Sequence, residues 1–141
     1  MSESARFKQT RDAHRTELAE DYVKTILDLI EEDGDAKLTE IAVRFGVAHP
    51  SAFKSLRKLE GDGLVILEPY KAVQLTSKGL ELAQKCRERH ESVVQFLIVL
   101  GLDPALAEID GEGIEHHVSE QTLQLMKEFT ENHKAISDRS S

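Results

Sequence analysis

The segment GEGIEHH, residues 111–117, carries side chains of the kinds that bind divalent cations: Glu112, Glu115 and His116. If residues 114–120 form a helix, Glu115 and His116 follow Glu112 by three and four residues, so the three side chains can converge on one point. Carboxylate oxygens together with an imidazole nitrogen suit a divalent first-row cation. The alternative interpretation is a solvated acidic turn with surface histidines, and this segment by itself does not decide between the two.

The composition narrows the classes of protein to consider. The chain has 141 residues, 40% of them hydrophobic, which is enough to build one domain or two small units with a shared core. The single cysteine, Cys86, excludes an internal disulfide and fits a reducing compartment. No apolar run reaches the roughly 18 residues needed to cross a bilayer, and the N-terminus lacks the apolar segment of a signal peptide. We therefore expect a cytoplasmic protein with no membrane partner.

The formal net charge of −8 does not by itself indicate nucleic-acid binding, but the charge is uneven along the chain. Acidic residues are concentrated after residue 80, whereas residues 46–60 carry Lys54, Arg57 and Lys58 against a single acid, Glu60. This local basic patch is where a negatively charged partner would bind.

The basic patch falls inside a pattern typical of a helix-turn-helix, residues 37–63. A helix at about 13–32, ended by Gly34, precedes it. A short helix is followed by Gly46, and a second helix begins near Pro50 with an apolar inner face and a basic outer face. A plain helical hairpin is the alternative. The residues expected to contact DNA from the second helix are Ser51, Phe53, Lys54 and Arg57. Phe53 is equally compatible with packing under the segment that follows.

That following segment, residues 64–76, has the pattern of a β-hairpin with a turn at residues 69–71, which makes it the wing of a winged helix-turn-helix. Lys71 at its tip is expected to contact a DNA phosphate. A long helix over residues 77–100 then carries an apolar seam with heptad-like spacing that includes His90. A histidine on such a seam is either a satisfied core residue or a ligand. The last helix is expected at about 119–133.

These elements predict a mainly α fold with a small β-hairpin. Its parts are a mobile N-terminal arm at 1–12, a winged helix-turn-helix DNA-binding domain at 13–76, a helical metal-binding and dimerisation domain at 77–135, and a tail at 136–141. No internal repeat or low-complexity tract is present.

Four motifs in this order resemble a known family. They are EDY at 20–22, LTSKG at 75–79, RERH at 87–90 and EGIEHHVS at 112–119. The chain resembles, over about residues 18–130, the manganese transport regulators of the diphtheria-toxin-repressor family, in the short form without an SH3-like third domain. The resemblance implies a cytosolic, homodimeric, metal-activated repressor. Its winged helix would bind a double-stranded DNA operator, and its C-terminal helices would bind metal and dimerise.

Carried over residue by residue, the resemblance implies a set of five metal ligands: Asp21, His90, Glu112, Glu115 and His116. Iron-type members carry a cysteine at the position of Glu115. An oxygen ligand there removes the soft donor and favours Mn²⁺, with Fe²⁺ as the alternative cofactor. The implied mechanism is that a dication ties the first helix to the C-terminal half. The two DNA-reading helices of the dimer are then held about one helical turn of DNA apart, roughly 34 Å.

One residue departs from the family pattern. Manganese regulators commonly have a second carboxylate one turn after Asp21, where this chain has Lys24. An ammonium group there would repel a second cation, so we expect either one metal per subunit or a metal response that is altered or lost.

Three alternative functions remain: an iron-responsive repressor of the same family, a winged-helix regulator that binds a small organic ligand instead of metal, and a metallohydrolase. Because the chain has no HExxH motif and does have a helix-turn-helix with a wing, we do not expect an enzyme.

Overall fold

The computed structural model describes residues 2–140, with the side chains of residues 2–11 and 13–134. The fold is mainly α-helical with one small antiparallel hairpin, which confirms the predicted class. The elements in chain order are α1 (Glu3–Asp33), α2 (Leu38–Phe45), α3 (His49–Gly61), β1 (Val65–Ile66), β2 (Gln74–Leu75), α4 (Ser77–Val99), α5 (Pro104–Ile114) and α6 (Glu120–Ser140). The chain divides into two compact units, Met1–Gln84 and Lys85–Ser141, so the long helix α4 contributes to both.

Helix α1 begins earlier than the sequence pattern predicted. The Ser2 hydroxyl accepts a hydrogen bond from the backbone N–H of Ala5 and caps a helix that starts at Glu3. A serine in this position satisfies one of the free N–H groups at a helix start. Most of the segment that we expected to be a mobile arm is helical and forms the first turns of α1, and Met1 lies outside the described residues. The helix ends at Gly34 as predicted, where φ is +89°.

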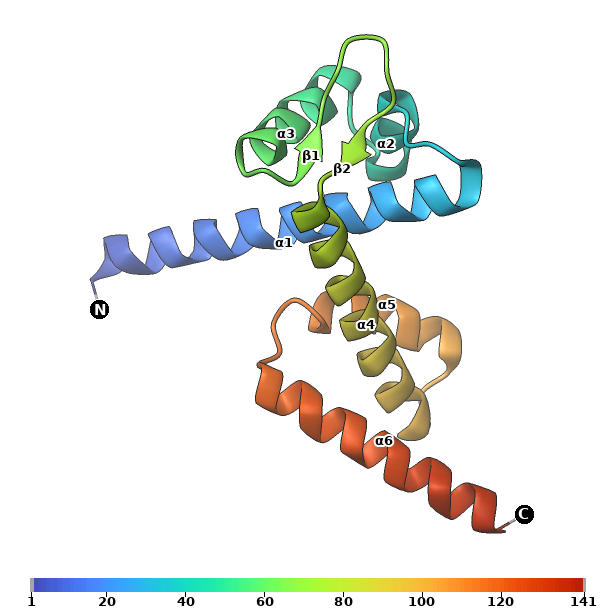
Figure 1. Ribbon diagram of the computed structural model, residues 1–141. Coiled ribbons are helices and arrows are strands. Elements are labelled where there is room, and N and C mark those ends of the chain that lie inside the picture. Colours follow the sequence, from blue (N-terminus) through green and yellow to red (C-terminus); the bar gives the residue numbers. More distant parts are fainter. Residues whose placement is uncertain (1, 141) are drawn as a thin grey trace. The chain divides into compact units, whose positions relative to one another are not determined.

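The N-terminal unit is built on the apolar stripe of α1. Figure 1 shows α2, α3 and the hairpin on the same side of this helix. Tyr22, Ile26 and Leu29 of α1 are buried against apolar residues of α2, α3 and the hairpin, and the Tyr22 ring stacks on Phe45 with ring centroids 4.1 Å apart. The predicted inner face of α3 is also confirmed, because its buried residues are Ala52, Leu56 and Leu59. Burial of this face leaves the basic side of α3 in solvent.

The hairpin and the start of α4 explain the LTSKG motif. In the hairpin, Val65 pairs with Leu75 and Ile66 with Gln74. The Thr76 hydroxyl donates to the carbonyl of Gly63 (2.6 Å) and accepts from the backbone N–H of Gly79 (3.0 Å) in the first turn of α4. A Cβ on Gly79 would lie 2.0 Å from the backbone oxygen of Leu64. Glycine is therefore required where α4 leaves the wing.

In the C-terminal unit, α5 and α6 flank the C-terminal part of α4 (Figure 1). Val93 and Val94 of α4, Ala107 of α5 and Leu123 of α6 are buried. The helix over residues 114–120 that we considered as a condition for metal binding is absent. Instead α5 runs through Ile114, residues 115–117 form a turn, and α6 begins at Glu120. Helix α6 continues to Ser140, through most of the segment expected to be a frayed tail. Among the described residues, no helix is both long enough and apolar enough to cross a bilayer.

Candidate functional site

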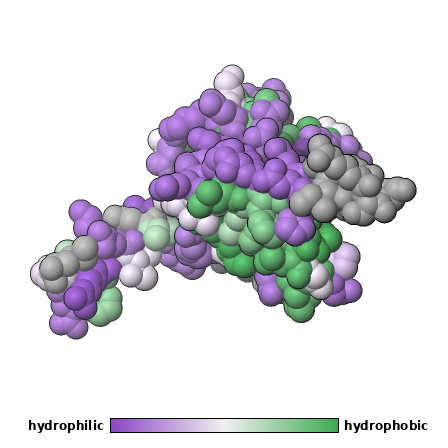
Figure 2. Space-filling model, turned by 90° about the horizontal axis from the view of Figure 1, so that it is seen from below, coloured by the Kyte–Doolittle hydropathy of each residue, from purple (hydrophilic) through white to green (hydrophobic). Residues whose placement is uncertain are grey.

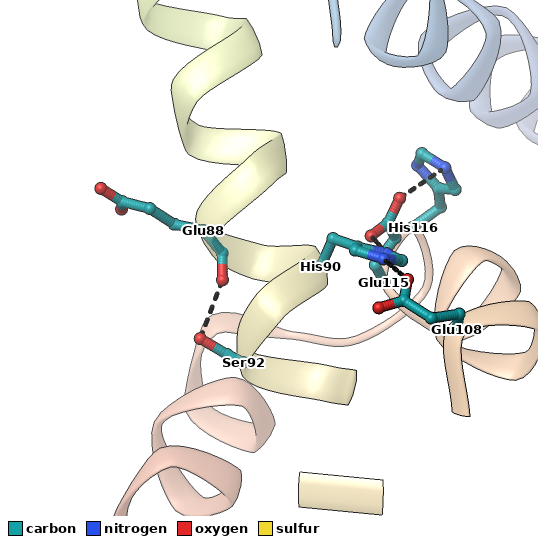
Figure 3. Close-up of polar contacts among 6 residues, drawn as sticks. All are labelled: Glu88, His90, Ser92, Glu108, Glu115 and His116. Carbon is teal, nitrogen blue, oxygen red and sulfur yellow. Dashed lines mark hydrogen bonds and ion pairs between the residues drawn. The ribbon is translucent and has the colours of Figure 1, made fainter. Parts of the chain in front are cut away.

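His90 of α4 contacts the carboxylates of Glu108 and Glu115 (Figure 3), and Glu112 lies close by. His90, Glu112 and Glu115 each offer a ligand atom, and these atoms lie within 4.8 Å of one another. A six-coordinate divalent ion with bonds of about 2.1–2.5 Å separates its donors by at most about 5 Å, so the spacing fits one ion. The set of one imidazole and two carboxylates suits a borderline-hard cation.

Within the cluster of His90, Glu112 and Glu115, the two residues in closest contact are also the least exposed. Nδ1 of His90 lies 2.6 Å from Oε2 of Glu115, and the two side chains are 12% and 2% exposed. A carboxylate this deeply buried is costly unless a cationic or hydrogen-bonding partner offsets its charge. His90 is thus neither fully buried nor a surface residue, and the His90 imidazole is a hydrogen-bonding partner for the buried Glu115 carboxyl group.

Close packing of α5 on α4 places these side chains. Gly111 of α5 is buried, and a Cβ there would lie 2.8 Å from Cγ2 of Val94 and 3.8 Å from the His90 ring. The missing side chain lets the two helices approach closely enough for carboxylates of α5 to reach an imidazole of α4. Gly111 therefore acts in helix packing, a role that the GEGIEHH segment alone did not indicate.

The other predicted ligands are placed as follows. His116 lies in the turn after α5, with Nε2 3.4 Å from Oε1 of Glu115. Asp21 lies on α1 in the N-terminal unit, directly before the buried Tyr22, and Lys24 lies one turn further along the same helix. The next residue, His117, is exposed and lines a shallow groove with Ile109 and Asp110.

The sequence analysis missed Glu108. Its Oε2 lies 2.7 Å from Nε2 of His90, on the ring edge opposite to the Glu115 contact (Figure 3). Glu108 precedes Glu112 by four residues and Glu115 by seven, which puts all three on one face of α5. This spacing was visible in the sequence, but for the GEGIEHH segment we considered a helix only from residue 114 and did not extend the face back to residue 108.

The predicted DNA-contacting residues lie on the outer side of the N-terminal unit. Ser51, Lys54 and Arg57 are exposed on α3, and Lys71 is exposed at the turn of the hairpin. Phe53 is 43% exposed, and the Arg57 guanidinium lies 5.4 Å from the centroid of its ring. Phe53, Arg57 and Lys71 line one groove between α3 and the hairpin. Tyr70 at the hairpin turn, which the sequence analysis did not single out, lines the same groove and is fully exposed.

Two of these cations have nearby acidic partners. Arg57 contacts Glu60 at 2.9 Å, and Lys71 contacts Glu68 at 2.7 Å. The hydrogen bond and charge of Glu68 raise the pKa of Lys71 above its usual value, so this side chain stays protonated. Exposed ion pairs of this kind are weak and exchange readily for other anions such as phosphate. Lys54 and Ser51 extend the same surface along α3.

Comparison with known proteins identifies the class. Residues 14–73 match the model of the iron dependent repressor N-terminal DNA binding domain, and residues 76–137 match that of the iron dependent repressor metal binding and dimerisation domain. The chain belongs to the iron-dependent repressor family, the family of the diphtheria toxin repressor. It is a DNA-binding transcriptional regulator with a metal-binding and dimerisation domain.

Two similar relatives are transcriptional regulators called MntR. The transcriptional regulator MntR of Escherichia coli O157:H7 is 49% identical over 129 residues, which cover 92% of this chain and 83% of that protein. The HTH-type transcriptional regulator MntR of Listeria monocytogenes (strain HCC23) is 38% identical over 117 residues, covering 81% of this chain and 82% of that protein.

Solved structures agree with this family assignment. A structure described as a manganese-dependent transcriptional repressor complex with manganese has a TM-score of 0.72 and 31% identity over 79% of this chain. The manganese regulator SloR has a TM-score of 0.68 and 28% identity over the same share. The chain spans about half the length of each of these two proteins, 52% in both cases.

Proposed function

We propose that this chain is a Mn²⁺-activated, DNA-binding repressor of metal-transport genes that acts as a cytoplasmic homodimer. The observation that carries the proposal is the cluster of His90, Glu112 and Glu115, whose ligand atoms lie within 4.8 Å of one another in a domain of the metal-binding class. Relatives named as manganese regulators support Mn²⁺ as the cation. The oxygen donor at Glu115 supports the same choice over a more thiophilic metal.

We propose His90, Glu112, Glu115 and His116 as ligands from the C-terminal unit. A bound dication would supply the positive charge that offsets the repulsion among these carboxylates. His90 would supply a nitrogen donor from α4, and Glu112 and Glu115 would supply oxygen donors from the end of α5 and the turn that follows it. The family resemblance adds Asp21 of α1, which would give metal binding a direct influence on the DNA-binding unit. Metal binding would then favour DNA binding through a greater affinity for the DNA-competent form.

For DNA, we propose that α3 enters the major groove and that the hairpin contacts the phosphate backbone. Ser51, Lys54 and Arg57 are the proposed contacts of α3, with Phe53 beside them to touch a thymine methyl. Lys71 is the proposed phosphate contact of the wing. The exposure of these residues, and the groove that three of them share, support the assignment.

Dimerisation is supported by apolar side chains left on the surface of the C-terminal unit. Figure 2 shows a face on which hydrophobic residues gather rather than disperse. The large hydrophobic residues exposed in this unit include Leu100, Leu106, Ile109, Leu125 and Phe129. Apolar patches of this kind on a small protein commonly mark an interface between subunits.

The test of this function is an anisotropy titration of DNA from upstream of the organism's manganese importer, with and without Mn²⁺. We expect tight binding only with Mn²⁺, and weaker activation by Fe²⁺ under anaerobic conditions. Asp21→Asn is expected to lose the dependence on Mn²⁺. Equal DNA affinity in the presence and absence of either metal would instead support a metal-independent winged-helix regulator.

We propose that Lys24 limits each subunit to one tightly bound Mn²⁺, because an ammonium group stands where manganese regulators commonly have a second carboxylate. Equilibrium dialysis measures this stoichiometry directly. Two tightly bound ions per wild-type subunit would contradict it, and Lys24→Glu is expected to raise the number from one to two. We further propose that the cluster regulates DNA binding and does not catalyse hydrolysis, which the winged helix in the same chain supports.

A further inference from the structure

Glu108 occupies a position that the family resemblance does not assign. The His90 ring lies between two carboxylates, with Nδ1 2.6 Å from Glu115 and Nε2 2.7 Å from Glu108. Figure 3 draws both contacts as dashed lines from the His90 ring. Glu115 is buried, whereas the side chain of Glu108 is 62% exposed. The two carboxylates therefore have the same partner but different surroundings.

The chemistry of the imidazole ring allows different roles for Glu108 and Glu115. A neutral imidazole has one N–H group and one nitrogen lone pair, and it binds a metal through the lone pair. Nδ1 faces Glu115, and Glu115 belongs with His90 and Glu112 to the set of residues whose ligand atoms lie within 4.8 Å of one another. Nε2 faces Glu108. Metal-bound histidines usually donate their other N–H to a carboxylate or carbonyl, which fixes the tautomer and the ring orientation.

We propose that Glu108 is a positioning residue for the metal site. Its carboxylate accepts the N–H of His90 Nε2 and so holds the imidazole in the tautomer whose Nδ1 lone pair faces Glu115. The close packing of α5 on α4 at Gly111 also places the Glu108 carboxylate, because Glu108 lies on the face of α5 that Gly111 brings against α4. This inference rests on the proposed metal binding and adds a residue outside the ligand set.

The test compares Mn²⁺ affinity in the full-length chain by competition with a fluorescent chelator. Loss of an outer carboxylate partner typically weakens metal binding by about 10–100-fold, which is the effect expected for Glu108→Ala. Glu108→Gln keeps an oxygen acceptor for the N–H, so it should recover most of this loss. Asp110→Ala is the matched control, because it removes the same charge from the other side of α5, where Asp110 lines a groove with Ile109. Its affinity should equal that of the wild type.

A second measurement reports on the tautomer itself. In histidine-labelled protein loaded with diamagnetic Zn²⁺, ¹⁵N NMR should show the metal on Nδ1 and the proton on Nε2 of His90. A metal on Nε2 would overturn the proposal, since Glu108 would then lie on the metal side as a direct ligand. Wild-type affinity in Glu108→Ala, or equal losses in Glu108→Ala and Glu108→Gln, would also overturn it. Failure of the wild-type chain to bind Mn²⁺ would overturn the proposed function, and this inference with it.

Discussion

Glu115→Ala is the substitution that should separate metal binding from folding most clearly. The Glu115 carboxylate is buried, contacts His90 at 2.6 Å and belongs to the group of ligand atoms that fits one ion. Removing it takes one of the three clustered donors from the C-terminal unit and leaves α5 otherwise unchanged. We expect the loss to exceed the 10–100-fold that an outer partner typically contributes to metal affinity.

The expected change in melting temperature follows from the thermodynamic linkage between Mn²⁺ binding and folding. At a free Mn²⁺ concentration of 100 times the wild-type Kd, binding stabilises the folded chain by about 2.7 kcal/mol. For a chain of this length each kcal/mol corresponds to roughly 3–5 °C, so the wild-type melting temperature should rise by about 10 °C. If Glu115→Ala weakens binding by 100-fold or more, the same Mn²⁺ concentration contributes at most about 0.4 kcal/mol, or roughly 1–2 °C.

The assay is differential scanning calorimetry of each protein with and without Mn²⁺. The substitution also changes the metal-free protein, because it removes a buried carboxyl group that contacts His90. The comparison is therefore the shift caused by Mn²⁺ within each variant, which cancels that change. Asp110→Ala is the control and should keep the full shift. A full shift of about 10 °C in a natively folded Glu115→Ala protein would refute the assignment of Glu115 as a ligand.

Three further outcomes are expected. Lys54→Ala should weaken operator binding by about 1–3 kcal/mol in an anisotropy titration with Mn²⁺ while leaving the thermal shift intact; an unchanged affinity would remove Lys54 from the contact surface. Gly79→Ala should lower the free energy of unfolding by about 1–3 kcal/mol or more in urea, since its Cβ would meet the Leu64 carbonyl at 2.0 Å; wild-type stability would show that α4 can shift at no cost. Gly111→Ala should lower Mn²⁺ affinity by forcing α5 away from Val94, measured by chelator competition, and unchanged affinity would mean that the site tolerates a displaced helix.

The winged helix was predictable because its signals are local. The apolar positions of α3 recur with the helix period, and Gly46 and Pro50 mark the turn and the next helix start. The structure buries Ala52, Leu56 and Leu59 and leaves Lys54 and Arg57 outside, as that pattern requires. The helix ends were less predictable, because the Ser2 cap that extends α1 contributes little compared with an apolar stripe.

The ligand cluster was predictable only in part. The motif that contains Glu112 and Glu115 pointed to metal, although we placed these residues at the start of a helix and they lie at the end of one. The two glutamates come close to each other at either end of a helix, because a spacing of three or four residues keeps two side chains on one helix face. What the motif could not contain was His90, which lies on another helix and was connected to the cluster only through the family resemblance.

The sequence by itself determined the fold class, the basic outer face of α3 and the residue types of the candidate metal cluster, because helix periodicity and residue chemistry are properties of short segments. Only the tertiary structure decided which carboxylate faces which nitrogen of His90, and that Glu108 belongs beside the ring. The roles of Gly79 and Gly111 also required it. The physical reason is that these contacts join residues from different elements, and their distances depend on how closely two helices, or a helix and a hairpin, can pack.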